Sequence, residues 1–281
     1  MLRNEVESDP LERLTSSILQ SSRYRSLCPE VVRRIGAGEL AQRKTWKEAE
    51  KETRNRLHQI GGAYLESRPP YGKWVELLRQ VADAETYRDE LKRMMLCHAS
   101  TRERLPILDS FYERTLGSIR PIRSVIDVAC GFNALALPWM GIEDGGKYLG
   151  CDLFSDMASF LSDAASLMPC GPKCDVRTSV RDVSATPPDG EADLAIVLKF
   201  LPLLERSAAP QMLEWLQQLH TRYALVSFPT RTLGGRNVGM AGTYDGRFRE
   251  VLQQAGWNSE RFEFSSELCY LVELKARVPV G

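Results

Sequence analysis

The sequence predicts an α/β fold in which residues 1–98 form a helical domain and residues 99–281 form a domain built on a β-sheet. Two observations lead to this division. No segment of the first part alternates with the period of two that is typical of strands. After Arg120-Pro121, short apolar runs typical of buried strands alternate with helical segments, which indicates a parallel sheet covered on both faces.

Several helices are expected before the sheet. One begins at Pro10, directly after Asp9, because proline favours the first position of a helix. Others begin at Pro29 and at Thr45, and the last of these ends at Gly61-Gly62. Two further helices are expected over 73–81 and 86–98, and a linker helix over 100–117 leads to the sheet.

Seven strands are expected, over 124–128, 148–151, 176–180, 194–198, 224–228, 261–264 and 268–274. Helices fit between the first five, so those strands should be parallel. Only a tight turn can join the last two, which should therefore pair antiparallel. Five parallel strands with a terminal hairpin is the layout of the Rossmann-like, seven-stranded sheet of S-adenosylmethionine-dependent methyltransferases. A dehydrogenase sheet more often continues with a sixth parallel strand.

The expected strand ends carry residues suited to a nucleoside. Ligands of open parallel sheets bind beyond the carboxyl ends of the strands. Ala129 and Gly131 follow the first strand, and Asp152 follows the second, 21 residues past Gly131, where a carboxylate accepts hydrogen bonds from ribose. Asp182 follows the third strand, where it can accept from the adenine amine, and Leu198 ends the fourth. Each aspartate taken alone could equally be a helix cap.

The turn after the first strand contains a single glycine. A pyrophosphate needs several free backbone N–H groups at a helix N-terminus. S-adenosylmethionine has no phosphate, so this turn favours it over a dinucleotide. Its carboxylate requires a cation, and Arg102 and Arg104 lie just upstream. A surface salt bridge to Glu103 or Asp109 is the alternative role for either arginine.

Composition indicates the cellular compartment in which the protein is expected. Apolar residues make up 43% of the 281 residues, and no run approaches the ~18 apolar residues of a membrane span. The charged first residues do not form a secretory signal. The seven cysteines are odd in number and lack a C-x-x-C pair, which predicts reduced thiols and a cytoplasmic protein. Cys170 and Cys174 have no further ligands nearby, so no metal site is expected, and nothing in the sequence indicates a dimer rather than a monomer.

The charge is balanced overall, with 37 basic and 37 acidic residues, but it is locally uneven. Between residues 21 and 44, two acidic residues accompany six basic ones: Arg23, Arg25, Arg33, Arg34, Arg43 and Lys44. Such an excess is typical of a phosphate-binding surface. A solvated helix face remains the alternative.

Three longer segments resemble one known family: HASTRERLPILDSFY (98–112), VACGFNALALPWMG (128–141) and VLKFLPLLE (197–205). The chain is similar there to the aminoglycoside-resistance 16S rRNA methyltransferases that modify guanine N7 in the decoding site. Residues 24–34, 56–65 and 228–240 resemble that family too. The sequence departs from it at Ala134, where the family often has proline, and around 207–211.

This resemblance implies roles for particular residues. It implies that Arg104 holds the cofactor carboxylate, and it places around the cofactor Tyr64, His98, Ala99, Ser100, Ala129, Asp152, Asp182, Val183 and Leu198. With an rRNA substrate in the 30S subunit, the six basic residues between 21 and 44 become backbone contacts. The segment after the fifth strand supplies further contacts through Arg231, Arg236 and Arg247, and an apolar wedge through Met240; a plain surface loop is the alternative there.

Guanine N7 carries a lone pair and no proton, so no general base is expected. Other readings remain open from the residues. They are a methyltransferase that modifies adenine N1, a small molecule or a protein, an NAD-dependent oxidoreductase, and a non-catalytic RNA-binding module.

Overall fold

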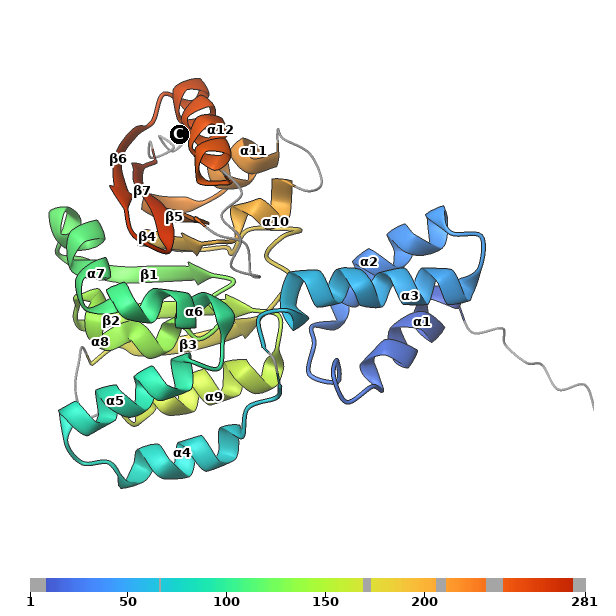
Figure 1. Ribbon diagram of the computed structural model, residues 1–281, viewed down its shortest axis with the longest axis horizontal. Coiled ribbons are helices and arrows are strands. Elements are labelled where there is room, and N and C mark those ends of the chain that lie inside the picture. The colour runs from blue at the N-terminus through green and yellow to red at the C-terminus, as the bar shows by residue number, and fades with distance from the viewer. Residues whose placement is uncertain (1–8, 66, 169–172, 206–210, 231–239, 275–281) are drawn as a thin grey trace, which may run out of the picture.

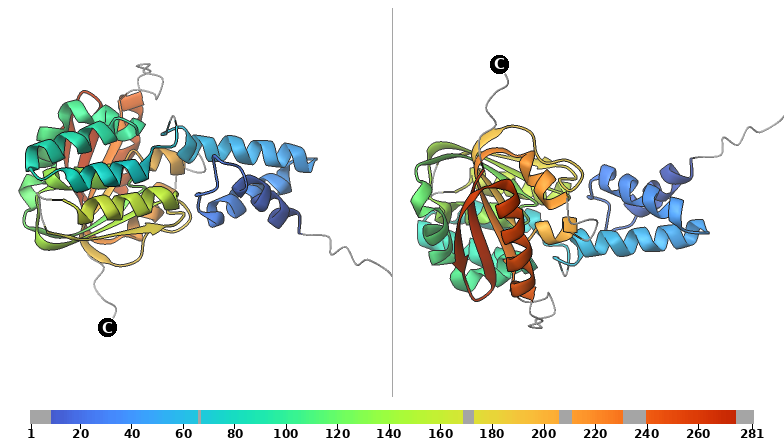
Figure 2. Two further views of the ribbon diagram at one scale, coloured as in Figure 1. Left: turned by 90° about the horizontal axis from the view of Figure 1, so that it is seen from below. Right: turned by 90° about the horizontal axis from the view of Figure 1, so that it is seen from above.

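A computed structural model describes residues 9–65, 67–168, 173–205, 211–230 and 240–274 (Figure 1). Three helices form a unit that projects from the rest of the molecule and is called the helical lobe here: α1 (Pro10–Leu19), α2 (Pro29–Gln42) and α3 (Trp46–Leu57). Figure 2 shows the same projection from two further directions. The expected helix starts at Pro10, Pro29 and Thr45 are confirmed.

Local chemistry explains these helices. The Asp9 side chain caps α1, and Thr45 forms a capping box with Glu48 at the start of α3. Gly36 lets α2 approach α1 closely, because a Cβ there would lie 2.8 Å from Leu14 Cδ2. The glycine that weakens α2 as an isolated helix therefore permits the packing that holds the lobe together.

Two helices of the expected N-terminal domain pack with the sheet instead. After α3, a π-helical turn (His58–Gly62) leads to α4 (Tyr71–Gln80) and α5 (Ala84–Met95). Tyr71 stacks on Phe160, and the Tyr87 hydroxyl donates to the carbonyl of Ala164 at 2.8 Å. Judged by these packing contacts, the boundary between the helical lobe and the sheet domain lies before Tyr71, whereas the sequence placed it after His98.

The sheet contains seven strands in the order β3-β2-β1-β4-β5-β7-β6. Their bounds are β1 (Ile122–Val128), β2 (Ile142–Asp152), β3 (Asp175–Val180), β4 (Glu191–Leu198), β5 (His220–Pro229), β6 (Asn258–Glu263) and β7 (Glu267–Glu273). The first five are parallel, and β7 is antiparallel to both β5 and β6. The expected strands and the terminal hairpin are confirmed.

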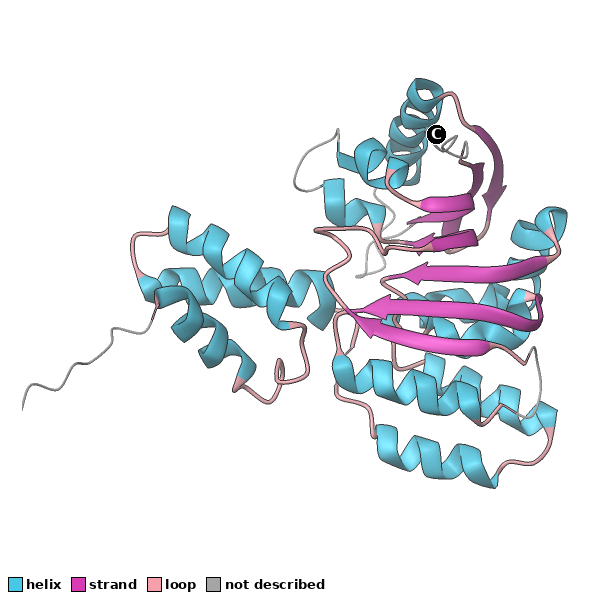
Figure 3. Ribbon diagram, turned by 180° about the vertical axis from the view of Figure 1, so that it is seen from behind, coloured by secondary structure: helices cyan, strands magenta, loops and turns pink. Residues whose placement is uncertain are grey.

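Register brings the carboxyl ends of the parallel strands to one edge. Val128 pairs with Cys151, Asp152 with Val180, and Leu198 with Ser227. Figure 3 shows the arrowheads of these strands pointing toward the helical lobe. The lobe therefore lies where ligands of parallel sheets bind.

Helices cover both faces of the sheet. Because successive side chains of a strand point to opposite faces, each strand contributes to both cores. On β4, Leu194, Ile196 and Leu198 join one core, while Ala195 and Val197 join the other. The first core also contains side chains of α5, α7 (Leu108–Leu116), α8 (Leu137–Met140) and α9 (Ser155–Ser166). The second contains side chains of α10 (Leu201–Glu205), α11 (Gln211–Gln217) and α12 (Met240–Ala255).

Two expectations about helices were wrong. The linker helix over 100–117 is interrupted by a 3₁₀ turn (Leu105–Ile107) containing Pro106, which separates α6 (Ala99–Arg104) from α7. No helix joins β3 to β4, since residues 181–190 form turns and bends. Two more 3₁₀ turns are Gly117–Ile119 and Asn133–Ala136.

Within the described ranges, no helix is long and apolar enough to cross a membrane. The same residues contain no group of three or more His, Cys, Asp or Glu side chains arranged to hold a metal ion. The six described cysteines are free thiols.

Candidate active site

A groove runs along the carboxyl ends of β1, β2, β3 and β4, between the sheet and the helical lobe. It consists of two adjoining cavities that share six lining residues: Ile60, Ala129, Asp152, Leu153, Phe200 and Leu203. One cavity extends toward Tyr64, His98, Ser100, Leu198 and Lys199. The other has a volume of about 680 Å³ and extends toward Asp182 and Val183, a size within the usual range for small-molecule sites.

Gly131, in the turn after β1, and Asp152, at the end of β2, are in direct contact. The Gly131 N–H donates to Asp152 Oδ2 at 2.8 Å, and the Leu153 N–H donates to Asp152 Oδ1 at 2.6 Å. Burial raises the pKa of Asp152, although these backbone hydrogen bonds oppose the shift. A carboxylate has about four acceptor sites, so Asp152 can still accept a hydrogen bond from a hydroxyl group in the groove.

Backbone conformation at the strand end is unusual. Gly131 has φ +51° and Ala129, which is not a glycine, has φ +50°. Left-handed backbone at a non-glycine residue costs about 1–3 kcal/mol and clusters at functional sites. A Cβ at Gly131 would lie 2.6 Å from His98 Cε1. The turn therefore requires glycine on both conformational and steric grounds.

His98 closes one end of the groove. Its ring stacks on Tyr64, with centroids 5.7 Å apart, and the Ala99 N–H donates to the Tyr64 carbonyl at 2.9 Å. Burial lowers the pKa of His98 to about 3, so the ring is neutral at working pH. Its Nδ1 is buried and has no hydrogen-bond partner among the described residues, which leaves a polar atom available to a ligand.

Asp182, at the other end, is already engaged. Its Oδ1 accepts hydrogen bonds from the N–H and the hydroxyl of Ser184, at 3.1 and 2.6 Å. Its Oδ2 accepts from Arg34 Nε at 2.7 Å. Arg34 belongs to α2, so this ion pair joins the helical lobe to the segment after β3. The neighbouring Val183 is buried.

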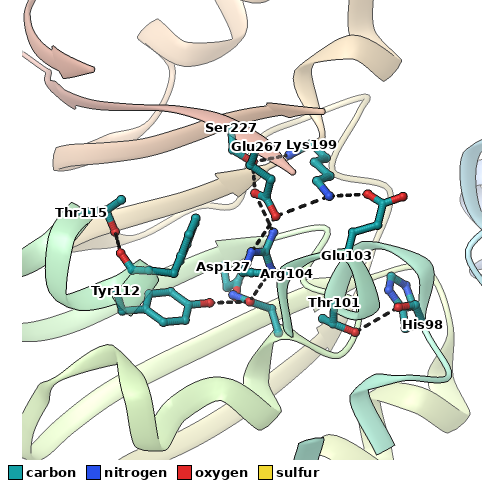
Figure 4. A network of polar contacts seen from close by, with 12 residues as sticks. His98, Thr101, Glu103, Arg104, Tyr112, Thr115, Asp127, Lys199, Ser227 and Glu267 are labelled. Carbon is teal, nitrogen blue, oxygen red and sulfur yellow. Dashed lines mark hydrogen bonds and ion pairs between the residues drawn. The ribbon is translucent and has the colours of Figure 1, made fainter. Parts of the chain in front are cut away.

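The end of β4 brings a lysine into the groove. Leu198 and Lys199 line it, and Lys199 has φ +57°. The Lys199 ammonium lies 2.6 Å from Glu103 Oε2 and 3.4 Å from Glu267 Oε1. Two carboxylates thus balance its charge (Figure 4). Lys199 was not among the predicted site residues, although a lysine inside the apolar run VLKFL was the available signal.

Arg104 is buried among polar side chains of the protein. Its side chain is 1% exposed, and it does not line the groove. Arg104 Nη2 donates to Glu267 Oε2 at 3.0 Å, and Nε lies 2.9 Å from Glu267 Oε1. Arg104 Nη1 donates to Asn133 Oδ1 at 3.0 Å. The described contacts therefore assign this arginine to a buried ion network (Arg104, Glu267, Lys199 and Glu103), and its binding of a cofactor carboxylate stays a prediction.

Further buried polar residues support that network. Asn133 Nδ2 donates to Asp127 Oδ2 at 2.6 Å, and Asn133 Oδ1 also accepts from the Tyr112 hydroxyl at 2.6 Å. Burial raises the pKa of Asp127 to about 7, against hydrogen bonds from Asn133 and Tyr148 that lower it. Asp127 is the only charged residue in the expected strand 124–128, and this was the signal in the sequence.

The predicted rRNA contacts between residues 21 and 44 are all exposed on the helical lobe. Some are paired with acidic side chains. Arg33 bonds Glu12 at 2.9 Å, and Arg43 bonds the fully buried Glu39 at 2.8 Å. Partial pairing reduces the local excess of positive charge that the sequence indicated. Arg23, which lies 2.9 Å from His58 Nδ1, has no acidic partner in its described contacts.

The predicted contacts after β5 are only partly described. Arg231 and Arg236 lie outside the described residues. Met240 begins α12, and its side chain is also outside the described part. Arg247 is exposed on α12.

Comparison with known proteins agrees with this arrangement. A family model described as "Ribosomal RNA methyltransferase (FmrO)" matches residues 20–271. The chain is 38% identical over 274 residues to a 16S rRNA (guanine(1405)-N(7))-methyltransferase of Frankia casuarinae, covering 95% of this chain and 94% of that protein. It is 37% identical to a protein of the same name from Serratia marcescens, covering 92% and 96%.

Solved structures are similar over the same length. The 16S rRNA methyltransferase RmtF, in complex with S-adenosyl-L-homocysteine, superposes with a TM-score of 0.78 at 32% identity, covering 95% of this chain and 99% of that one. The 16S rRNA methylase RmtB gives a TM-score of 0.75 at 33% identity, covering 94% and 98%.

Proposed function

Because the chain belongs to the FmrO family of ribosomal RNA methyltransferases, we propose that it methylates N7 of a guanine in the decoding site of 16S rRNA, using S-adenosylmethionine. The substrate in this proposal is the folded 30S subunit, which places the enzyme in the cytoplasm. Cells that contain it are then resistant to aminoglycosides that bind the decoding site. The name shared by the Frankia and Serratia relatives supports the guanine and its N7 position.

One observation carries the proposal: the groove presents acceptors for a nucleoside in the order of the strands. Asp152 at the end of β2 retains acceptor capacity for ribose hydroxyls, and Asp182 lies beyond β3 for the adenine amine. Apolar Val183 and Leu198 lie between and beside them. The unpartnered His98 Nδ1 provides a further polar contact. These residues fit S-adenosylmethionine, which supplies an electrophilic methyl group on a sulfonium sulfur.

The residues of the groove have no proton to move in this reaction. The N7 lone pair forms the new C–N bond as the C–S bond breaks, so the positive charge passes from sulfur to the purine. His98 is neutral, and Asp152 is engaged by two backbone N–H groups. What the chain contributes is orientation, since well-aligned partners gain about 7–11 kcal/mol.

The helical lobe lies beyond the carboxyl ends of the parallel strands (Figure 1), and its residue Arg34 lines the groove, so an extended substrate that enters the groove would pass the lobe. Arg23, Arg25 and Lys44 are exposed on it and are suited to rRNA phosphates. Contacts of this kind give affinity that falls steeply with salt. A target base inside a helix must also leave its stack, which costs a few kcal/mol.

The test is methylation of purified 30S subunits with tritiated S-adenosylmethionine, followed by borohydride and aniline cleavage and primer extension. A new stop at one decoding-site guanine is the expected result. Methylation at adenine N1 would instead give a stop without cleavage and would replace this proposal. Labelling of naked 16S rRNA as efficiently as of 30S subunits would contradict the proposed substrate.

A further inference from the structure

We propose that Arg34 of the helical lobe is a positioning residue of the cofactor site, where it orients the Asp182 carboxylate toward the exocyclic amine of adenine. This inference rests on the proposed use of S-adenosylmethionine. The sequence placed Arg34 among the rRNA contacts, and the structure gives it a different partner.

The contact is a closed ring of hydrogen bonds. Arg34 Nε donates to Asp182 Oδ2 at 2.7 Å, and Arg34 Nη2 donates to Ser184 Oγ at 2.8 Å. The Ser184 hydroxyl donates in turn to Asp182 Oδ1 at 2.6 Å. One guanidinium therefore binds both the carboxylate and the hydroxyl that supports it. Such planar two-point binding fixes the direction of a side chain, not only its charge.

Burial shows that the ring belongs to the groove. The Asp182 side chain is 7% exposed, and Arg34 lines the same cavity as Asp182, Val183 and Ser184. Arg34 is separated from Asp182 by 148 positions in the sequence. Through Arg34, the helical lobe forms part of the lining at the end of the groove where adenine is expected to bind.

The ring leaves room for a ligand. A carboxylate offers about four acceptor sites. In the part of the chain that the structure describes, three donors occupy sites on Asp182, two from Ser184 on Oδ1 and one from Arg34 on Oδ2. The remaining site is on Oδ2, so the atom held by Arg34 is the atom that can accept from the adenine amine. Loss of Arg34 leaves Oδ2 without its fixed direction.

The adjacent arginine provides a matched control. Arg33 lies on the same helix and is 45% exposed, against 47% for Arg34. Arg33 pairs with Glu12 inside the helical lobe and does not line the groove. Replacing either removes one positive charge from the same exposed surface, so any difference in cofactor affinity reports the contact with Asp182.

The experiment is calorimetric titration of the full-length variants Arg34→Gln, Arg34→Lys and Arg33→Gln with two ligands. One ligand is S-adenosylhomocysteine, and the other is S-inosylhomocysteine, which lacks the amine. For S-adenosylhomocysteine we expect Arg34→Gln to raise Kd about tenfold, Arg34→Lys to raise it less, and Arg33→Gln to change it by less than about twofold. For S-inosylhomocysteine we expect Arg34→Gln to change Kd by less than about twofold, since no amine reaches Oδ2.

Two results would overturn the inference. Equal weakening of both ligands by Arg34→Gln would mean that the arginine only holds the lobe in place. Unchanged affinity for S-adenosylhomocysteine would mean that Asp182 needs no partner. Failure of the wild-type protein to bind S-adenosylhomocysteine would instead reject the proposed function, which separates the two hypotheses.

Discussion

Replacing Glu267 by glutamine should be the most damaging single change in the buried ion network. Glu267 begins β7 and is fully buried. Its Oε2 accepts hydrogen bonds from Arg104 Nη2 at 3.0 Å and from the Ser227 hydroxyl at 2.8 Å. Its Oε1 lies 2.9 Å from Arg104 Nε and 3.4 Å from the Lys199 ammonium. Glutamine keeps the shape but removes the charge shared by two buried cations.

The expected loss of stability follows from the negative charge that Arg104 and Lys199 lose. Arg104 is 1% exposed, and in the variant its described acceptors would be two neutral amide oxygens, those of Asn133 and of the introduced glutamine. Removing one partner of a buried ion pair costs about 3–5 kcal/mol, because the other charge is left uncompensated. Total stabilities are roughly 5–15 kcal/mol, so the variant should lose about a fifth or more of its free energy of unfolding.

Urea unfolding of the two proteins, followed by circular dichroism at neutral pH, measures this loss. Glu103→Gln is the control, because Glu103 also pairs with Lys199 but its side chain is 31% exposed. That variant should lose about 1 kcal/mol or less. A loss below about 1 kcal/mol in Glu267→Gln would refute the reasoning, since it would mean that water or other groups compensate both cations.

The pH dependence gives an independent check of the same residue. Burial alone would raise the pKa of Glu267, but the charges of Arg104 and Lys199 outweigh it and hold the pKa below its ordinary value of 4.5. The ionised carboxylate therefore stabilises the protein above the unfolded-state pKa, and this contribution is lost as pH falls through the folded-state pKa. The difference in stability between wild type and Glu267→Gln should be largest at neutral pH and shrink in acid.

Three further predictions concern the groove and the lobe. Gly131→Ala should weaken S-adenosylhomocysteine binding at least about tenfold by calorimetry, because the added Cβ would clash with His98. Gly145→Ala is the control, since Gly145 also has a positive φ but has open space around it, and this variant should keep its affinity. Equal weakening by both substitutions would contradict the proposal that the ligand binds in the groove beside Gly131. Asp127→Asn should flatten the dependence of stability on pH between about 4 and 7. The pKa of Asp127 is raised from 3.8 to about 7, so wild type loses stability as pH rises from the lower value to the higher one, and a parallel decline in the variant would disprove this. Reversing the charges of Arg25 and Lys44 should weaken 30S binding and reduce its salt dependence, while a parallel loss of cofactor affinity would show a structural role.

The parts of the fold that follow local patterns were predictable from sequence. Apolar runs predicted the inner strands β1, β4 and β5, because a strand buried on both faces must be apolar throughout. The placement of Gly131 and Asp152 at neighbouring strand ends followed from the order of the strands, whereas the hydrogen bond between them was not predicted. The segment between β3 and β4 was expected to be helical, although its Pro-Pro-Asp-Gly sequence favours turns.

Contacts between distant segments were not predictable in the same way. Arg34 reads as one of several basic residues on a helix, and only the folded chain brings it to Asp182. Arg104 was expected at the cofactor because it lies upstream of the first strand, yet its partner Glu267 comes from the last one. No local pattern marks such a pair, since each residue alone is an ordinary polar side chain.

The position of β7 between β5 and β6 has a consequence for folding. Arg104 and Glu267 are separated by 163 positions, so their ion pair can form only after nearly the whole sheet has assembled. A fragment that ends before β7 would lack Glu267 and would leave the buried cations Arg104 and Lys199 without this counter-charge. Such a fragment should remain bound to chaperones, whereas addition of the missing β7 segment as a separate peptide should release it as a compact, protease-resistant species.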